Sequence, residues 1–139
     1  MEKKGIERVR EIMKTLRSEK GCPWDREQKI ETLKPYIIEE AFEVVEAIDG
    51  DMKDLPDELG DLLLQVVFVS QIAEESGKFN FDDVCDKISE KLIRRHPHVF
   101  GTIEADNSAE VIRNLEKLKI KEKDGNKSVL SGVPSGLPA

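Results

Sequence analysis

The pattern of hydrophobic and polar positions is most regular between residues 37 and 75, where it predicts two neighbouring helices. In the first, residues 37–49, apolar side chains recur at helical spacing and fill one broad arc, while glutamates fill the rest. In the second, residues 54–75, apolar residues surround nearly the whole circumference, so we expect this helix to be buried. Its polar stripe is narrow and consists of Glu58, Asp61 and Gln65.

A short connection joins these two helices and makes them antiparallel neighbours. Residues 50–53 are typical of a tight turn, with Asp54 as the N-cap of the second helix and Pro56 in its first turn. At a rise of about 1.5 Å per residue, Glu43 lies about 9 Å before the bend and Glu58 about 6 Å after it, so the two face each other at nearly the same height. The pairs predicted in this way are Glu43 with Glu58 and, one turn further from the bend, Glu40 with Asp61.

Carboxylates gathered on buried helix faces need a compensating cation or strong donors, or their pKa values must rise until they are neutral. Because the predicted ligands are oxygens, without His or Cys, they suit Mg²⁺ or Mn²⁺. A solvated helix face would explain the glutamates of the first helix alone. Glu58 and Asp61 favour a metal site instead, because they open an otherwise apolar helix. A carboxylate-bridged di-iron site is excluded, since neither histidine has a glutamate three residues before it.

The remaining hydrophobic pattern predicts further helices and an all-α fold. An amphipathic helix covers residues 6–16, and Asp25 is expected to cap a short helix that runs through Leu33. A break at residues 76–78 precedes a helix that Pro97 ends. Ser108 is a plausible cap of a last helix that reaches about residue 123. We therefore expect a bundle of four to five helices.

Length and composition predict a single domain with a lean core. The chain has 139 residues, of which 37% are charged and 38% hydrophobic. Helices as apolar as the one predicted at residues 54–75 would be better covered by a second copy of the chain. We expect homo-oligomerisation to complete the core, in a homodimer or a dimer of dimers.

Charge and cysteine content narrow the class of partner and the compartment. The net charge of −7, from 22 basic and 29 acidic residues, argues against a nucleic acid polymer as ligand, and an anionic substrate would need metal ions and a local basic patch. Cys22 and Cys85 are isolated, so reduced, partly buried thiols are expected. The N-terminus has no apolar run typical of a signal peptide, and no run of 18 apolar residues occurs. We expect a soluble, cytoplasmic protein without membrane contact.

A basic cluster formed by Lys91, Arg94 and Arg95 lies near the end of the predicted fourth long helix. Cations at a helix C-terminus gain about 0.3 to 1 kcal/mol each from the helix dipole, which explains their presence. It does not explain why three cations gather in an acidic chain. Arginine suits bidentate contact with phosphate, so we interpret this cluster as a phosphate-binding group.

Trp24 is the only tryptophan of the chain and lies in a predicted turn. Together with Tyr36 it could stack on a base or a ribose. A single tryptophan in a turn equally often fills the gap between helices. The sequence leaves both interpretations open.

Several of these residues resemble a known family. Glu39-Glu40-x-x-Glu43 followed by Glu58-x-x-Asp61 resembles the EExxE and ExxD signature of the all-α nucleoside triphosphate pyrophosphohydrolases. Within that superfamily, the segments Gly-Cys-Pro-Trp-Asp at 21–25 and Arg-Arg-His-Pro-His-Val-Phe at 94–100 resemble MazG. The resemblance spans roughly residues 6–123, in the same order. It implies a MazG-like domain over residues 1–123, followed at 124–139 by a flexible tail or linker rich in Gly, Ser and Pro.

The resemblance implies Mg²⁺-dependent hydrolysis of a nucleoside triphosphate between the α and β phosphates, which yields the monophosphate and pyrophosphate and serves nucleotide-pool control. Mn²⁺ is a possible substitute. We expect the metal ions at Glu40, Glu43, Glu58 and Asp61, water activation at Glu39, the phosphate tail at Lys91, Arg94 and Arg95, and the nucleotide near Trp24. The alternative is a non-catalytic helical oligomerisation module that binds a nucleotide or a protein partner.

Overall fold

The computed structural model describes residues 2–101 and 106–125, and the regular structure in these ranges is entirely helical. Five helices are 12 to 21 residues long. They are α1 (Gly5–Leu16), α3 (Lys34–Asp49), α4 (Leu55–Glu75), α5 (Phe81–Arg95) and α7 (Ser108–Gly125). The short elements are α2 (Pro23–Glu27), the 3₁₀ turn η1 (Glu31–Leu33) and α6 (Pro97–Phe100). The predicted all-α class is confirmed, and its four to five helices correspond to the long ones.

The chain divides into two compact units, residues 1–85 and residues 86–139. The first contains α1 to α4 and the start of α5, and the second contains the rest of α5 with α6 and α7. A domain that covers residues 1–123 stays a prediction. Most of the predicted tail, residues 126–139, lies outside the described residues.

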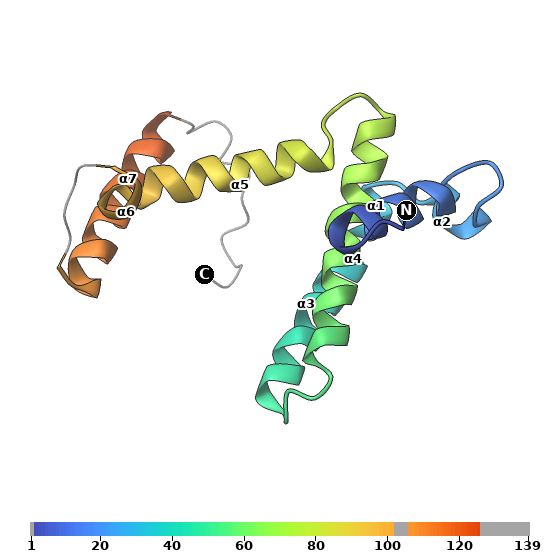
Figure 1. Ribbon diagram of the computed structural model, residues 1–139, viewed down its shortest axis with the longest axis horizontal. Coiled ribbons are helices and arrows are strands. Elements are labelled where there is room, and N and C mark those ends of the chain that lie inside the picture. Colours follow the sequence, from blue (N-terminus) through green and yellow to red (C-terminus); the bar gives the residue numbers. More distant parts are fainter. Residues whose placement is uncertain (1, 102–105, 126–139) are drawn as a thin grey trace. The chain divides into compact units, whose positions relative to one another are not determined.

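In the first unit, α3 and α4 run antiparallel side by side, and α1 packs on α4 (Figure 1). The buried core lies along the second half of α4. It consists of Met13 from α1, Leu33 from η1, and Val67, Phe68 and Ile72 from α4. The first half of α4, which is next to the bend, carries polar residues on the side that faces α3.

The prediction that α4 is buried on all sides is wrong for the single chain. Leu59, Leu63 and Val66 of α4 are 49%, 40% and 39% exposed. Ile38 and Phe42 of α3 are 71% and 61% exposed. The physical reason is that α1, η1 and α3 together cover only part of the circumference of α4. The first unit therefore presents an apolar surface on the hairpin.

Two of the predicted helix caps are also wrong. The backbone N–H of Arg26 donates to the carbonyl of Cys22 at 3.0 Å, so α2 begins before Asp25 and contains it. At α7, the side-chain oxygen of Asn107 accepts a hydrogen bond from the N–H three residues later at 3.0 Å, so the cap is Asn107 and not Ser108. An Asx residue one position earlier is as good a cap as serine, and sequence alone does not separate them.

Arg17 fastens the segment around α2 to α4. Its guanidinium donates to both carboxylate oxygens of Glu75, at 2.8 to 3.1 Å, and to the backbone carbonyls of Asp25 and Gln28. It also lies 5.9 Å from the ring centre of Phe68, and its side chain is only 9% exposed. The hydrogen bonds from Arg17 lower the pKa of Glu75. This anchor fixes α2 beside the core.

Cys22 and Cys85 are unbonded and half-buried, as expected for reduced thiols. Within the part of the chain that the structure describes, no helix combines the length and the apolarity that a membrane crossing requires.

Candidate metal centre

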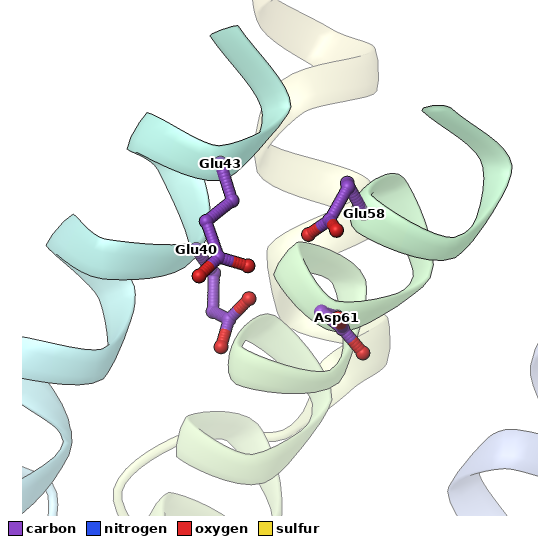
Figure 2. Close-up of side chains that lie close together, drawn as sticks. All are labelled: Glu40, Glu43, Glu58 and Asp61. Atoms are coloured by element: carbon purple, nitrogen blue, oxygen red, sulfur yellow. The ribbon is translucent and has the colours of Figure 1, made fainter. Parts of the chain in front are cut away.

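The two helices of the hairpin bring together the four carboxylates that were expected to face one another. Glu40 and Glu43 extend from α3, and Glu58 and Asp61 lie on the facing side of α4 (Figure 2). One carboxylate oxygen from each of the four lies within 4.8 Å of the others. This spread is compatible with direct binding of a small divalent cation.

Local sequence explains this convergence. The two carboxylates on each helix are three residues apart, and residues at this spacing share a face of an α-helix. A tight turn joins the helices, in which the N–H of Lys53 donates to the side chain of Asp51 at 2.9 Å. Met52 there adopts a φ of 64°, the left-handed conformation that a sharp reversal requires. Because the turn is short, Glu43 and Glu58 meet at one height.

The environment of the cluster raises the pKa values of two of its members, Glu58 and Glu40. A hydrogen bond between Glu58 and Glu43, together with burial and the charges of its neighbours, raises the pKa of Glu58 to about 7. Burial, followed by the charges of Glu43, Asp61 and Glu39, raises the pKa of Glu40. None of the ion pairs in the described residues involves these groups. Protonation of Glu58 therefore reduces a negative charge that no ion pair with Lys or Arg offsets.

Two buried oxygens of the cluster fit a cation with bound water. The Oε2 atoms of Glu40 and Glu58 are buried without a hydrogen-bond partner. Both are acceptors. A divalent cation with its bound waters would supply both positive charge and donors at such a place. The carboxylate set fits Mg²⁺ or Mn²⁺, which prefer hard oxygen ligands.

An open cavity of about 450 Å³ adjoins the cluster on the side of the bend. Its lining includes Glu43 and Glu58 of the cluster and the exposed Glu39, one residue before Glu40. The other lining residues are Phe42, Glu46, Ala47, Gly50, Asp51 and Asp54. Glu39 thus lies where water reaches the carboxylates.

Trp24 lies at the other end of the hairpin from the bend, beside the core. Its ring packs edge-on against Tyr36 at 5.9 Å and against Phe68 at 6.5 Å between centroids. It is nevertheless 48% exposed. The structure thus shows the packing contacts and leaves one part of the ring accessible, so stacking on a base stays a prediction.

The basic cluster belongs to the second unit, where α7 supplies an acidic partner. Glu122 accepts from Arg94 Nε at 2.6 Å and from Arg95 Nε and Nη2 at 3.1 and 2.6 Å. The hydrogen bonds from Arg95 and then Arg94 lower the pKa of Glu122 to about 2. Lys91 is exposed. Sequence reasoning missed Glu122, since nothing in the local pattern ties it to residues 27 and 28 positions away.

The all-α hairpin brings together four carboxylates, two of which have a buried oxygen without a partner. An acidic site of this kind, made of oxygen atoms alone, is of the class that suits divalent cations. Comparison with known proteins identifies the family. Residues 28–100 match the family model of the MazG nucleotide pyrophosphohydrolase domain. The chain therefore belongs to the MazG nucleotide pyrophosphohydrolase family, and the resemblance seen in the sequence is confirmed.

Named relatives agree with this assignment. The chain is 50% identical over 138 residues to a nucleoside triphosphate pyrophosphohydrolase of Escherichia coli K12, with 96% of this chain and 52% of that protein covered. It is also 50% identical over 131 residues to a nucleoside triphosphate pyrophosphohydrolase/pyrophosphatase MazG of Thermotoga maritima, with 92% of this chain and 50% of that protein covered. The chain spans about half the length of these curated relatives.

A solved structure shares the fold. The crystal structure of a MazG-related protein from Thermotoga maritima superposes with a TM-score of 0.68 at 29% sequence identity. The match covers 83% of this chain and 99% of that one.

The raised pKa of Glu58 predicts a pH dependence of stability in the metal-free protein. Because folding raises this pKa from 4.5 to about 7, the folded protein holds more protons than the unfolded chain between these two values. The stabilisation is fully present below the lower value and is lost as the pH rises through the higher one. We expect the melting temperature of the wild type, measured relative to that of Glu58→Gln, to fall across this window.

Glu74→Gln, which removes an exposed carboxylate from the same helix, is the control and should follow the wild type. Parallel melting curves for the wild type and Glu58→Gln at every pH would contradict the proton shared with Glu43.

Proposed function

We propose that this chain is a Mg²⁺-dependent nucleoside triphosphate pyrophosphohydrolase. It hydrolyses a ribo- or deoxyribonucleoside triphosphate between the α and β phosphates and releases the monophosphate and pyrophosphate, in control of the nucleotide pool. The observation that carries the proposal is the group of four carboxylates within 4.8 Å, with buried oxygens that lack a partner. Family membership and the printed names of the relatives support the reaction type.

Five carboxylates of the hairpin have a part in this reaction. Glu40, Glu43, Glu58 and Asp61 would hold the divalent ions, which would neutralise charge that develops on the phosphates. As a ligand, Glu58 would have to be deprotonated. Glu39 orients a water in the adjoining cavity and accepts its proton. The water oxygen bonds to the α-phosphorus, the bond to the bridging oxygen breaks, and pyrophosphate leaves.

The cations of the second unit bind the phosphate tail. Glu122 engages both arginines, but a guanidinium carries five N–H donors, so these hydrogen bonds occupy only part of each group. Two arginines, one glutamate and Lys91 leave a net positive charge of about two, by the ordinary charges of these groups.

A second copy of the chain covers the apolar surface of the hairpin. Phe42 of α3 and Leu63 of α4 belong to this surface and are 61% and 40% exposed. Contiguous apolar surface on a hairpin is typical of a protein interface. We propose a homodimer or a dimer of dimers on this basis.

The metal assignment predicts two different kinds of inactive variant. Glu58→Gln and Asp61→Asn should lower Mg²⁺-dependent pyrophosphate release by at least about 100-fold and weaken Mn²⁺ binding in calorimetry, since each removes a ligand. Glu39→Gln should lower kcat by about 100-fold or more while Mn²⁺ affinity stays at the wild-type value. Helix content, measured by circular dichroism, is the folding control.

Full turnover in Glu58→Gln or Asp61→Asn would discard the metal assignment. Nucleotide binding by the wild type without pyrophosphate release, with and without Mg²⁺, would instead favour a non-catalytic binding module.

The phosphate-binding role of the arginines predicts an effect on KM. Arg95→Ala should raise KM for a triphosphate by about 10-fold or more, because a hydrogen bond to a charged group contributes about 1.5 to 3 kcal/mol. Glu122→Gln is the matched variant, since it leaves both guanidiniums in place and should not raise KM. Steady-state kinetics on both variants separate the two cases. An equal loss of thermal stability in both, with KM unchanged, would return Arg95 to a purely structural role.

The proposed assembly predicts a mass of two or four chains in sedimentation equilibrium at micromolar protein concentration. Phe42→Asp should shift the protein towards the monomer, because it places a charge within the apolar surface. Ile12→Asp changes a 50% exposed apolar residue on α1 and should leave the mass unchanged. A wild-type protein that sediments as a monomer would disprove this interface.

A further inference from the structure

One buried polar side chain of the hairpin has no role in the reaction described so far. Gln65 lies one turn beyond Asp61 on α4 and is only 8% exposed. Its Oε1 atom is buried and accepts no hydrogen bond. A buried carbonyl oxygen left without a donor costs about 1 to 3 kcal/mol. A ligand that donates to this oxygen would recover that free energy.

The position of Gln65 on α4 indicates which part of a substrate would donate this hydrogen bond. Glu58, Asp61, Gln65 and Phe68 follow one line along the helix, at spacings of three or four residues. At the rise of an α-helix, Gln65 lies about 6 Å beyond Asp61 and about 4.5 Å before Phe68. Gln65 therefore stands between the carboxylate cluster and the aromatic end of the hairpin.

The facing helix gives the same order. Glu43 is hydrogen-bonded to Glu58, and Glu40 and Asp61 lie in the same cluster. The same antiparallel register, continued one turn away from the bend, predicts that Tyr36 lies opposite Gln65. Tyr36 is the residue against which the ring of Trp24 packs. Trp24 and Tyr36 are 48% and 36% exposed, so both offer ring surface to a ligand.

Arg17 keeps this aromatic end in place. Its hydrogen bonds to the carbonyls of Asp25 and Gln28 hold the α2 segment, which carries Trp24, against α4. The aromatic pair therefore has a fixed position relative to the line of polar residues on α4. Groups that are already fixed bind a ligand more tightly, because less ordering is needed on binding.

We propose that Gln65 is a specificity-determining residue, whose side-chain amide hydrogen-bonds to the edge of the substrate's base. The proposal rests on the proposed function for the placement of the phosphates at the four carboxylates. A nucleotide bound there directs its base away from the bend, across Gln65 and towards Trp24 and Tyr36. An amide carries an acceptor and a donor side by side, and so matches a base edge with the complementary pair.

The expected consequence is a ranking of bases that depends on this one amide. A site built to hydrogen-bond a group rejects analogues that lack it, because the buried partner is then left unpaired. Removing the amide should therefore weaken binding of the preferred base by about 10-fold or more and change the others less. The ranking among bases should flatten.

Gln65→Met tests this, since it keeps the length of the side chain and the helix propensity but removes both hydrogen-bonding groups. Calorimetry with non-hydrolysable triphosphates of the different bases, each in ribo and deoxyribo form, gives the ranking without turnover. Mn²⁺ affinity without nucleotide is measured in parallel. We expect a flattened base ranking and unchanged Mn²⁺ affinity.

Gln71→Met is the matched control. Gln71 is the same residue type on the same helix, but its amide already donates to Glu75 at 3.0 Å. Its substitution should leave the base ranking intact. Gln65→Asn, which withdraws the amide by one methylene, is a second test that keeps the position polar, and it should flatten the ranking as well.

Three results would overturn the proposal: a wild type that binds all bases equally, a ranking that survives in both Gln65 variants, or a Gln65→Met protein whose only change is weaker Mn²⁺ binding. A shift confined to ribo against deoxyribo forms would also reject the base edge as the partner. A wild type that ranks bases but releases no pyrophosphate from natural triphosphates would refute the proposed function and still decide the role of Gln65.

Discussion

The main constraint on the hairpin is the repulsion among four carboxylates, one oxygen of each lying within 4.8 Å of the others. Like charges at this separation are unfavourable, more so where water is partly excluded. A hydrogen bond between Glu58 and Glu43 reduces this repulsion and raises the pKa of Glu58 to about 7. Burial, followed by the charges of its neighbours, raises the pKa of Glu40 as well. The divalent cations proposed above would offset the charge of the whole group at once.

Such a destabilised cluster requires support from elsewhere in the unit. The two halves of α4 have different roles, one in stability and one in the carboxylate cluster. Its second half contributes Phe68 and Ile72 to a core closed by Met13, and Arg17 ties Glu75 of this half to the α2 segment. Its first half carries the carboxylates and belongs to no buried cluster. Stability and chemistry therefore occupy successive turns of one helix, and the rigid helix transmits the position of the core to the ligands.

The hairpin and its carboxylates could be predicted from the sequence because both follow from spacing within about 25 residues and from one short turn. The exposure of Leu63 and Phe42 could not, since burial depends on how many other elements a single chain can supply. Nor could the pairing of Arg17 with Glu75, 58 positions apart, because such contacts depend on the packing of whole helices. Family resemblance supplied the reaction type, which spacing alone does not contain.

The acidic character of the chain sets the conditions for an anionic substrate. With a net charge of −7, the protein's overall field repels a triphosphate, and the carboxylate cluster repels it further until cations are bound. In the proposed reaction, bound cations would reverse the sign of the local field where the phosphates lie. The metal would then have to be present before, or arrive with, the nucleotide. Arg94 and Arg95 would not remove this requirement, because Glu122 offsets one of their two charges. Recognition of the uncharged base would fall to groups such as Gln65, whose hydrogen bonding does not depend on this field.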